Sequence, residues 1–368
     1  MPPPDAVRKL RWPGTICRQS DIMAAVVDDP IVCPVPGLRW VDDSSPGITR
    51  KIVDGHFAYF DAKGKRVRDQ AEIDRINALV IPPAYTDVWI SSDARGHIQA
   101  TGRDARGRKQ YRYHPDWHAT RDADKYDSLI AFAGVLPRIR RQVAKDLARP
   151  GLPREKVIAA IVSLLESTLI RIGSKKYALA NRSFGLTTLR TRHAKVLGQT
   201  VRFRFRGKSG VEHDVKIADR RLATIIRRCM EIPGQALFTC VDGPDGTPHA
   251  IDSGEVNDYL RDAAGADVTA KDYRTWAGSV MAFDTLQASV WDSETAAKRT
   301  LVDVTREVAS RLGNTPAVCR KCYIHPAIFA HYLEQALPDR KTPREPRGLR
   351  ADERRFLAFL TTVVNAES

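Results

Sequence analysis

A tyrosine follows a helix stop and a helix restart in the segment Leu312–Pro326, which reads Leu-Gly-Asn-Thr-Pro-Ala-Val-Cys-Arg-Lys-Cys-Tyr-Ile-His-Pro. A glycine can end one helix and Thr-Pro can begin the next, with the amide of Asn314 between them. A tyrosine hydroxyl with a pKa near ~10 is a poor nucleophile at neutral pH, so Tyr323 would need help as it loses its proton. A single tyrosine before Ile-His-Pro is more often a core residue at a helix end, so Tyr323 alone decides nothing.

Charge is one-sided between Glu166 and Glu212. The 45 residues between them contain eleven lysines or arginines and no acid. Solvated faces usually mix the two signs, and this run spans an expected helix end and an expected hairpin rather than a loose tail. The run therefore predicts a surface that faces phosphates, and a generic basic face is the alternative.

A second basic segment, Gly102–Tyr113, combines five cations with an amide and two tyrosines. Cations hold phosphates, whereas Gln110, Tyr111 and Tyr113 have the side chains that groove or base-edge contacts require. A charged sheet edge that prevents aggregation is the other explanation. Two basic patches in two parts of the chain favour a clamp around a DNA duplex.

The composition agrees with a polyanionic partner. The 368 residues carry 59 lysines and arginines against 44 acids, a formal net charge of +15, and cations displace the counterions condensed on a phosphate backbone. No apolar run approaches the roughly 18–20 residues that span a bilayer, and Met1-Pro-Pro-Pro-Asp lacks an apolar leader. Six cysteines are too few for a disulfide scaffold. We expect a cytoplasmic, nucleoid-associated protein with no membrane partner, whose true start is Met1 or Met23.

Three suggestive patterns are rejected. The turn Gly207–Ser209 looks like the end of a phosphate-binding P-loop, but that motif needs glycine where Arg202 stands. The pair in Cys319–Cys322 has the spacing of half a zinc site, without a second half nearby. His325 lies two positions after the tyrosine, and such positions do not face each other on a helix. We expect no metal and no cofactor.

Two parts of the chain differ in their apolar period. From about residue 31 to 115, short aromatic or β-branched runs such as Lys51–Phe60 are bounded by turn residues, and one short helix is expected over Gln70–Ala78. Beyond about residue 120, apolar residues repeat at three and four positions, as in helices. The sequence predicts an α+β fold with a small β-rich N-terminal domain and a larger, mainly α-helical domain.

Strands are expected to interrupt the helical part. A helix is predicted over Arg154–Ile172, with Gly173 just after its end. Residues 184–217 favour strands, because arginines alternate with apolar residues at 201–206 and a turn follows. Further helices are predicted over Leu222–Met230, Ser253–Ala264, Tyr273–Leu286 and Ala296–Leu312, and a last apolar stripe at Phe356, Phe359 and Val363.

Taken in order, several segments resemble the motifs of the type IB DNA topoisomerases of the poxvirus-like and bacterial kind. They are Ile81–Tyr85, Gly107–Tyr113, Leu169–Tyr177, Phe205–His213, Lys271–Trp276 and the stretch from Gly313-Asn-Thr-Pro to Tyr323. The resemblance covers about residues 35–365. Motifs that recur in the family's order are far more specific than any one of them.

The resemblance implies a reaction and the residues that perform it. It implies Tyr323 as the nucleophile, Arg171 and Arg274 as the two catalytic arginines, Lys208 as the hairpin lysine, and Asn314 where the poxvirus enzymes have histidine. Guanidinium forks suit phosphoryl oxygens, an amide can donate one neutral hydrogen bond, and an ammonium can protonate a leaving 5′ oxygen. The implied activity is relaxation of supercoiled duplex DNA through a 3′-phosphotyrosyl link, without ATP or metal, by a monomeric clamp.

Further DNA contacts and a domain division are also expected. The predicted DNA-binding side chains are Lys109, Gln110, Tyr111, Tyr113, Lys176, Tyr177, Arg204 and Lys271. Residues 1–30 are expected to form an extension, 31–118 the β-rich DNA-binding domain, and 119–368 the catalytic domain with a β-hairpin at 199–217.

Two other functions remain open at this stage. A tyrosine recombinase shares the catalytic domain and the phosphotyrosine chemistry, but usually carries His-x-x-Arg where this chain has Lys271-Asp-Tyr-Arg274. A non-catalytic basic DNA-binding protein is supported by charge alone. Relaxation of a plasmid without any recombination site separates these possibilities.

Overall fold

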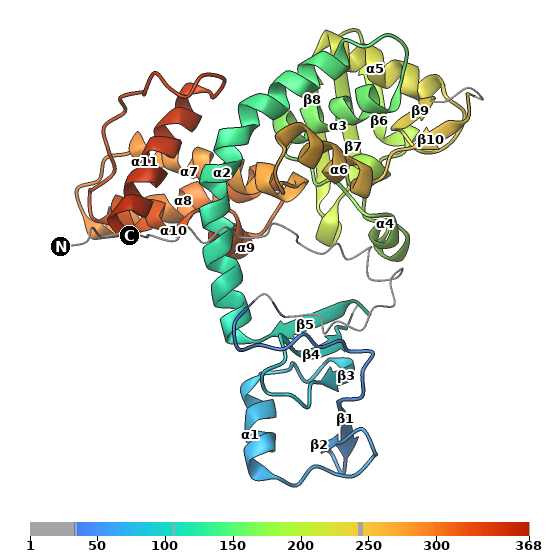
Figure 1. Ribbon diagram of the computed structural model, residues 1–368, viewed down its shortest axis with the longest axis vertical. Helices are drawn as coiled ribbons and strands as arrows, with labels where there is room; N and C mark the ends of the chain where they lie inside the picture. Colours follow the sequence, from blue (N-terminus) through green and yellow to red (C-terminus); the bar gives the residue numbers. More distant parts are fainter. Residues whose placement is uncertain (1–32, 34, 106, 242–245, 368) are drawn as a thin grey trace, which may run out of the picture. The chain divides into compact units, whose positions relative to one another are not determined.

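The computed structural model describes residues 33, 35–105, 107–241 and 246–367 of the chain (Figure 1). The chain divides into two compact units, Met1–Asp122 and Ala123–Ser368. The expected extension over residues 1–30 lies outside the described residues. The functional domain boundaries proposed from the sequence, at 30/31 and 118/119, stay predictions.

One antiparallel sheet forms the body of the first unit, with strand order β2-β1-β3-β4-β5. The strands are β1 (Ile48–Val53), β2 (His56–Phe60), β3 (Thr86–Ile90), β4 (Ile98–Arg103) and β5 (Lys109–Tyr113). Helix α1 covers Gln70–Ala78, as predicted, and the side chain of Asp69 caps it by accepting a hydrogen bond from Ala71 N. Ile76 of α1 packs against Ile90 of the sheet, and both are buried.

The second unit is mainly helical and has one large core. Helix α2 (Pro115–Leu147) crosses the division between the units. The other helices are α3 (Arg154–Thr168), α4 (Lys175–Asn181), α5 (Arg220–Glu231), α6 (Ser253–Ala264), α7 (Ala270–Gln287), α8 (Glu294–Leu312), α9 (Pro316–Cys322), α10 (Pro326–Leu333) and α11 (Ala351–Glu367). Helix α7 contacts α3, α6, α8, α10 and α11, so it forms the centre of this unit. Within the described ranges, no helix is long and apolar enough to cross a membrane.

A three-stranded sheet lies between α4 and α5 along the chain, in the order β6-β7-β8. Its strands are β6 (Ala194–Leu197), β7 (Thr200–Arg206) and β8 (Glu212–Ala218). The predicted hairpin is β7–β8, with β6 as an additional antiparallel neighbour of β7. A short two-stranded ladder, β9 (Thr239–Val241) with β10 (Pro248–Ala250), precedes α6.

Two predictions for this unit were wrong in detail, although the predicted fold class is confirmed. Helix α3 ends at Thr168 rather than Ile172, because Leu169 takes a left-handed conformation with φ 56°. The apolar period continues past the true end because Leu169 and Ile170, which follow the helix, stay buried. Residues 184–193 are not strands, since 3-10 turns at Leu186–Thr188 and Thr191–His193 come before β6.

Candidate active site

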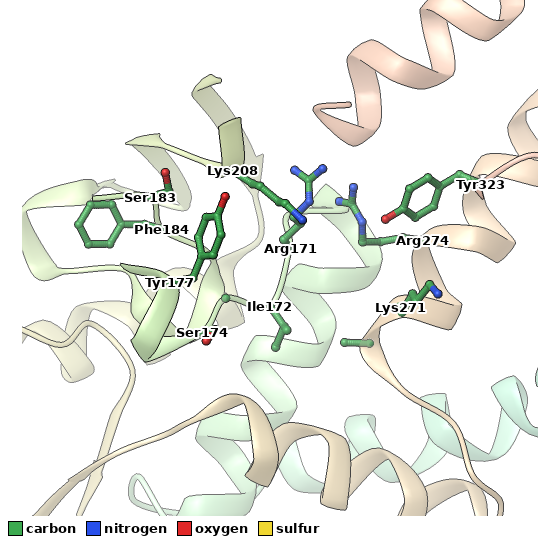
Figure 2. A pocket seen from close by; sticks show the side chains of 12 residues that line it. Arg171, Ile172, Ser174, Tyr177, Ser183, Phe184, Lys208, Lys271, Arg274 and Tyr323 are labelled. Atoms are coloured by element: carbon green, nitrogen blue, oxygen red, sulfur yellow. The ribbon is translucent and has the colours of Figure 1, made fainter. Parts of the chain in front are cut away.

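Four of the five side chains expected to be catalytic line one cavity in the second unit. They are Arg171, Lys208, Arg274 and Tyr323, and the cavity has a volume of about 370 Å³. Figure 2 shows the Tyr323 hydroxyl turned toward the guanidinium of Arg274, with Arg171 and Lys208 farther along the same cavity. These residues lie up to 152 positions apart in the sequence (323 − 171), so the fold rather than the local chain brings them together.

The segment after α3 places Arg171. Leu169 closes the helix with a hydrogen bond from its N–H to Leu165 O at 3.0 Å, and an irregular segment follows up to Ser174. Arg171 O accepts from Leu186 N at 2.8 Å, which fixes the segment against the following turn. A methyl group added at Gly185 would lie 2.4 Å from Arg171 O, so this close approach requires glycine at position 185.

Asn314, the fifth expected residue, is held by Arg171. The Nη1 of Arg171 donates to Gly313 O at 3.0 Å, and its Nη2 donates to Asn314 Oδ1. Gly313 ends α8 with φ 57°, a conformation that glycine adopts without strain. The Nδ2 of Asn314 is buried without a hydrogen-bond partner among the described residues. Asn314 does not itself line the cavity, but it is bound by Arg171, which does.

Arg274 projects from α7 and is almost completely buried, with 4% of its surface exposed. Its Nη2 donates to Leu312 O at 2.7 Å, and its Nη1 donates to Leu169 O. The Nε is buried without a hydrogen-bond partner in the described part of the chain. The guanidinium carbon lies 5.3 Å from the centre of the Tyr323 ring. Arg274 therefore joins the end of α3, the end of α8 and the tyrosine.

Two cationic side chains, the buried Arg274 and the partly buried Arg171, line this cavity. Burial, and after it the charge of Arg171, lower the pKa of Arg274 to about 10, although Tyr323 opposes both effects. Burial also lowers the pKa of Arg171, again against the influence of Tyr323. Both guanidinium groups keep their charge at neutral pH. A phosphodiester anion and a developing phenolate would each relieve the repulsion between them.

Backbone contacts with α7 fix the position of Tyr323. Tyr323 follows the last turn of α9, where its N–H donates to Cys319 O at 2.9 Å. The hydroxyl of Ser279 donates to Tyr323 O at 3.2 Å and accepts from His325 N at 3.0 Å. A methyl group added at Gly278 would lie 2.6 Å from Tyr323 O. Gly278 and Ser279 were not predicted from the sequence, where their only signal is a pair of small residues within a helix.

Replacing Ser279 with alanine should lower the free energy of unfolding by about 1–3 kcal/mol, because it leaves the buried N–H of His325 without its acceptor. Urea denaturation measures this change. Ser289→Ala is the control, since the Ser289 hydroxyl only donates to Thr285 O one turn earlier. Equal losses in the two variants would contradict a specific role for Ser279.

Lys208 lies in the turn between β7 and β8 and is exposed. The turn uses left-handed residues, with φ 63° at Ser209 and 81° at Gly210. The ammonium nitrogen of Lys208 lies 5.8 Å from the centre of the Tyr177 ring. An exposed cation on a hairpin tip, at the rim of the cavity, can approach a bound strand from outside.

His325 and the cysteine pair have structural surroundings. The Nδ1 of His325 accepts from Ala327 N at 3.2 Å and so caps α10. Burial raises the pKa of the Cys319 thiol, while Asn314 and the two arginines oppose this rise. No group of three or more histidines, cysteines or acids in the described ranges could hold a metal ion.

The predicted DNA-binding side chains have different surroundings. Tyr177 and Lys271 line the cavity itself. Arg204 forms an exposed ion pair with Asp214 at 3.1 Å, and Arg202 binds the same carboxylate. The side chain of Lys176 lies outside the described ones.

The remaining predicted contacts belong to the first unit. Lys109 pairs with Asp43 at 2.5 Å, and Gln110 Nε2 donates to Asp104 Oδ2 at 2.9 Å. The rings of Tyr111 and Tyr113 are stacked with centres 5.9 Å apart. The acids that hold Lys109 and Gln110 would have to release them for DNA.

Comparisons with known proteins match both units. The family model described as eukaryotic DNA topoisomerase I, catalytic core, matches residues 114–342. The model described as bacterial DNA topoisomerase IB, N-terminal domain, matches residues 56–104. The first match covers more than half of the chain, including all five expected catalytic positions.

Individual relatives carry the same kind of name. The chain is 28% identical over 285 residues to DNA topoisomerase 1B of Acanthamoeba polyphaga mimivirus, covering 76% of this chain and 85% of the viral one. It is 25% identical over 150 residues to DNA topoisomerase 1B of vaccinia virus (strain Copenhagen), 40% of this chain and 48% of that one. For DNA topoisomerase 1 of Mycosarcoma maydis the identity is 25% over 176 residues, 43% and 17% of the respective chains. This chain belongs to the type IB DNA topoisomerases.

Proposed function

We propose that Tyr323 is the nucleophile with which this type IB DNA topoisomerase cuts and rejoins one strand of duplex DNA. The phenolic oxygen attacks the scissile phosphorus, the bond from phosphorus to the 5′ oxygen breaks, and a 3′-phosphotyrosyl bond forms. The phenolic proton leaves to solvent, and the departing 5′ oxygen takes a proton from Lys208. Rejoining is the reverse reaction, so the energy of the bond is conserved without ATP.

The observation that carries this proposal is a pair of buried donor groups, one on Arg274, which lines the cavity, and one on Asn314, which is bound by Arg171 of the same cavity. Arg274 Nε and Asn314 Nδ2 lack partners among the described residues, while the other groups of both side chains are fixed by hydrogen bonds. Preorganised donors of this kind stabilise charge that develops on a phosphoryl oxygen. Because a neutral asparagine stands where histidine could carry a charge, the stabilisation of negative charge rests more on Arg171 and Arg274.

Plasmid relaxation tests this function directly. The wild-type protein should remove positive and negative supercoils in EDTA, without added nucleotide, because the proposed steps use only side chains of the chain itself. Topoisomer distributions on agarose gels measure the reaction. A strict need for magnesium or ATP would contradict the mechanism.

Lys208→Ala should slow single-turnover cleavage about a hundredfold. This is the low end of the range for the loss of a general acid, because water can reach this exposed position and supply the proton in place of the lysine. A substrate with sulfur in place of the bridging 5′ oxygen should restore the rate, since a thiolate leaves without a proton. Lys216→Ala is the control, because Lys216 is a cation on the same hairpin that lies away from the turn, opposite Arg202 in the strand register. No recovery on the sulfur substrate would remove the acid role of Lys208.

We also propose the cellular setting and the assembly. The surplus of positive charge and the match to a bacterial N-terminal domain support a bacterial enzyme that works on the nucleoid in the cytoplasm. The two basic patches, one in each unit, support a monomer that closes on duplex DNA as a clamp. Gel filtration coupled to light scattering tests the monomer.

A further inference from the structure

His213 is an imidazole near the cavity to which the mechanism above gives no role. It lies on β8, directly opposite Phe205 of β7 in the strand register. The two rings are stacked, with centres 4.7 Å apart and planes 6° from parallel. Phe205 is buried in the core, so this cross-strand stack fixes the plane of the imidazole.

One edge of the ring packs against the turn that carries Lys208. A methyl group added at Gly207 would lie 2.5 Å from His213 Nε2, so only the bare backbone of glycine fits beside the ring. Gly207 N donates to Val211 O at 2.7 Å, which closes the turn. Lys208 directly follows Gly207, so the imidazole packs against the backbone immediately before Lys208.

The ring also packs against the peptide that holds the phosphate-binding groups. A methyl group added at Gly313 would lie 2.7 Å from His213 Cε1. The carbonyl of Gly313 accepts from Arg171 Nη1 at 3.0 Å, and Asn314 follows directly. A single imidazole thus separates the lysine turn from the arginine and the asparagine.

The charge of the ring suits this position. Burial and the charges of Arg171 and Arg274 lower the pKa of His213, and only Glu212 opposes them. A neutral, flat group fills the space between the two elements without adding another cation beside Arg171 and Arg274.

We infer that His213 is a positioning residue that sets the distance between Lys208 and the phosphate held by Arg171 and Asn314. The inference rests on the proposed role of Lys208 as general acid. Removal of the ring leaves empty space beside Gly207 and Gly313, so the turn that carries Lys208 moves relative to the phosphate. The transfer of the proton to the 5′ oxygen then slows, whereas the attack by Tyr323 does not depend on the turn.

The test compares two DNA substrates that differ in one atom. Single-turnover cleavage is measured with an ordinary bridging 5′ oxygen and with sulfur at the same position. His213→Ala should cut the oxygen substrate about ten- to a hundredfold more slowly than wild type, as expected for a displacement near 1 Å. It should cut the sulfur substrate at close to the wild-type rate. Equal slowing on both substrates would overturn the inference.

Two further histidine variants separate positioning from other roles. His213→Gln keeps a flat neutral group of similar length without a titratable nitrogen, and should restore most of the rate on oxygen. If it is as slow as His213→Ala, the imidazole acts as an acid or base and the positioning role is overturned. His193→Ala is the matched control, since the His193 ring lies 6.5 Å from the Phe205 ring but belongs to a different turn, Thr191–His193. A preference of this variant for sulfur would also count against the inference.

Lys208→Ala, measured in the same experiment, separates this inference from the proposed function. If sulfur restores Lys208→Ala but not His213→Ala, the positioning role alone is rejected. If sulfur restores neither, the acid role of Lys208 is rejected and the inference with it. Thermal unfolding of each variant shows whether the slow ones are folded at the assay temperature.

Discussion

Replacing Tyr323 with phenylalanine should abolish plasmid relaxation and the covalent protein–DNA complex. The substitution removes only the attacking oxygen. The ring remains beside Arg274, and the backbone contacts of residue 323 with α7 are unchanged. Without a nucleophile there is no path to the phosphotyrosyl bond, so the loss should exceed that from any residue that only stabilises the transition state. Binding of duplex DNA should stay near the wild-type level.

The covalent complex is measured on denaturing gels. The substrate is a DNA strand that is labelled at its 5′ end and has its cleavage site close to a nick. Tyr332→Phe is a matched control, because the Tyr332 hydroxyl is also buried and has no hydrogen-bond partner in the described ranges. This second variant should cleave and relax DNA like wild type. A labelled complex with Tyr323→Phe would show that another residue attacks the phosphate.

The predictable part of the fold is the part with clear periodic patterns. Helices α1 and α6 have the predicted bounds, because a capping aspartate precedes each of them, and α6 also ends at the left-handed Gly265. The end of α3 was missed because no local rule places a leucine in a left-handed conformation. Gly173 was expected to follow the helix, yet it lies beside Gly185 in the segment that fixes Arg171.

The sequence names the residues of the site but not how they are held. Motif order pointed to Arg171 and Arg274, whose roles remain proposals. Their guanidinium groups are anchored on the carbonyl oxygens of Leu169, Leu312 and Gly313. Backbone carbonyls carry no sequence signal, and their positions depend on how α3, α7 and α8 pack. The contacts of Ser279 and Gly278 escape prediction for the same reason.

Replacing Arg274 with lysine should slow single-turnover cleavage about a hundred- to a thousandfold, the range for losing one preorganised donor at a transition state. Arginine has five N–H donors in a rigid fork, which lets it bind Leu312 O and Leu169 O and still present Nε. A lysine ammonium is a single point with three donors. It can satisfy the two carbonyls or bind the phosphate, but it cannot do both.

Cleavage at saturating enzyme separates this effect from weaker DNA binding, and thermal unfolding reports how much stability the orphaned carbonyls remove. Arg306→Lys is the control, since Arg306 lies exposed on α8 and pairs only with Asp303 among the contacts described for it. If Arg274→Lys cleaves at the wild-type rate, charge alone suffices at this position and the unpartnered Nε has no role in the reaction. A rate loss with normal DNA binding means that the buried Arg274 acts in the reaction, unlike exposed basic side chains that only attract the duplex.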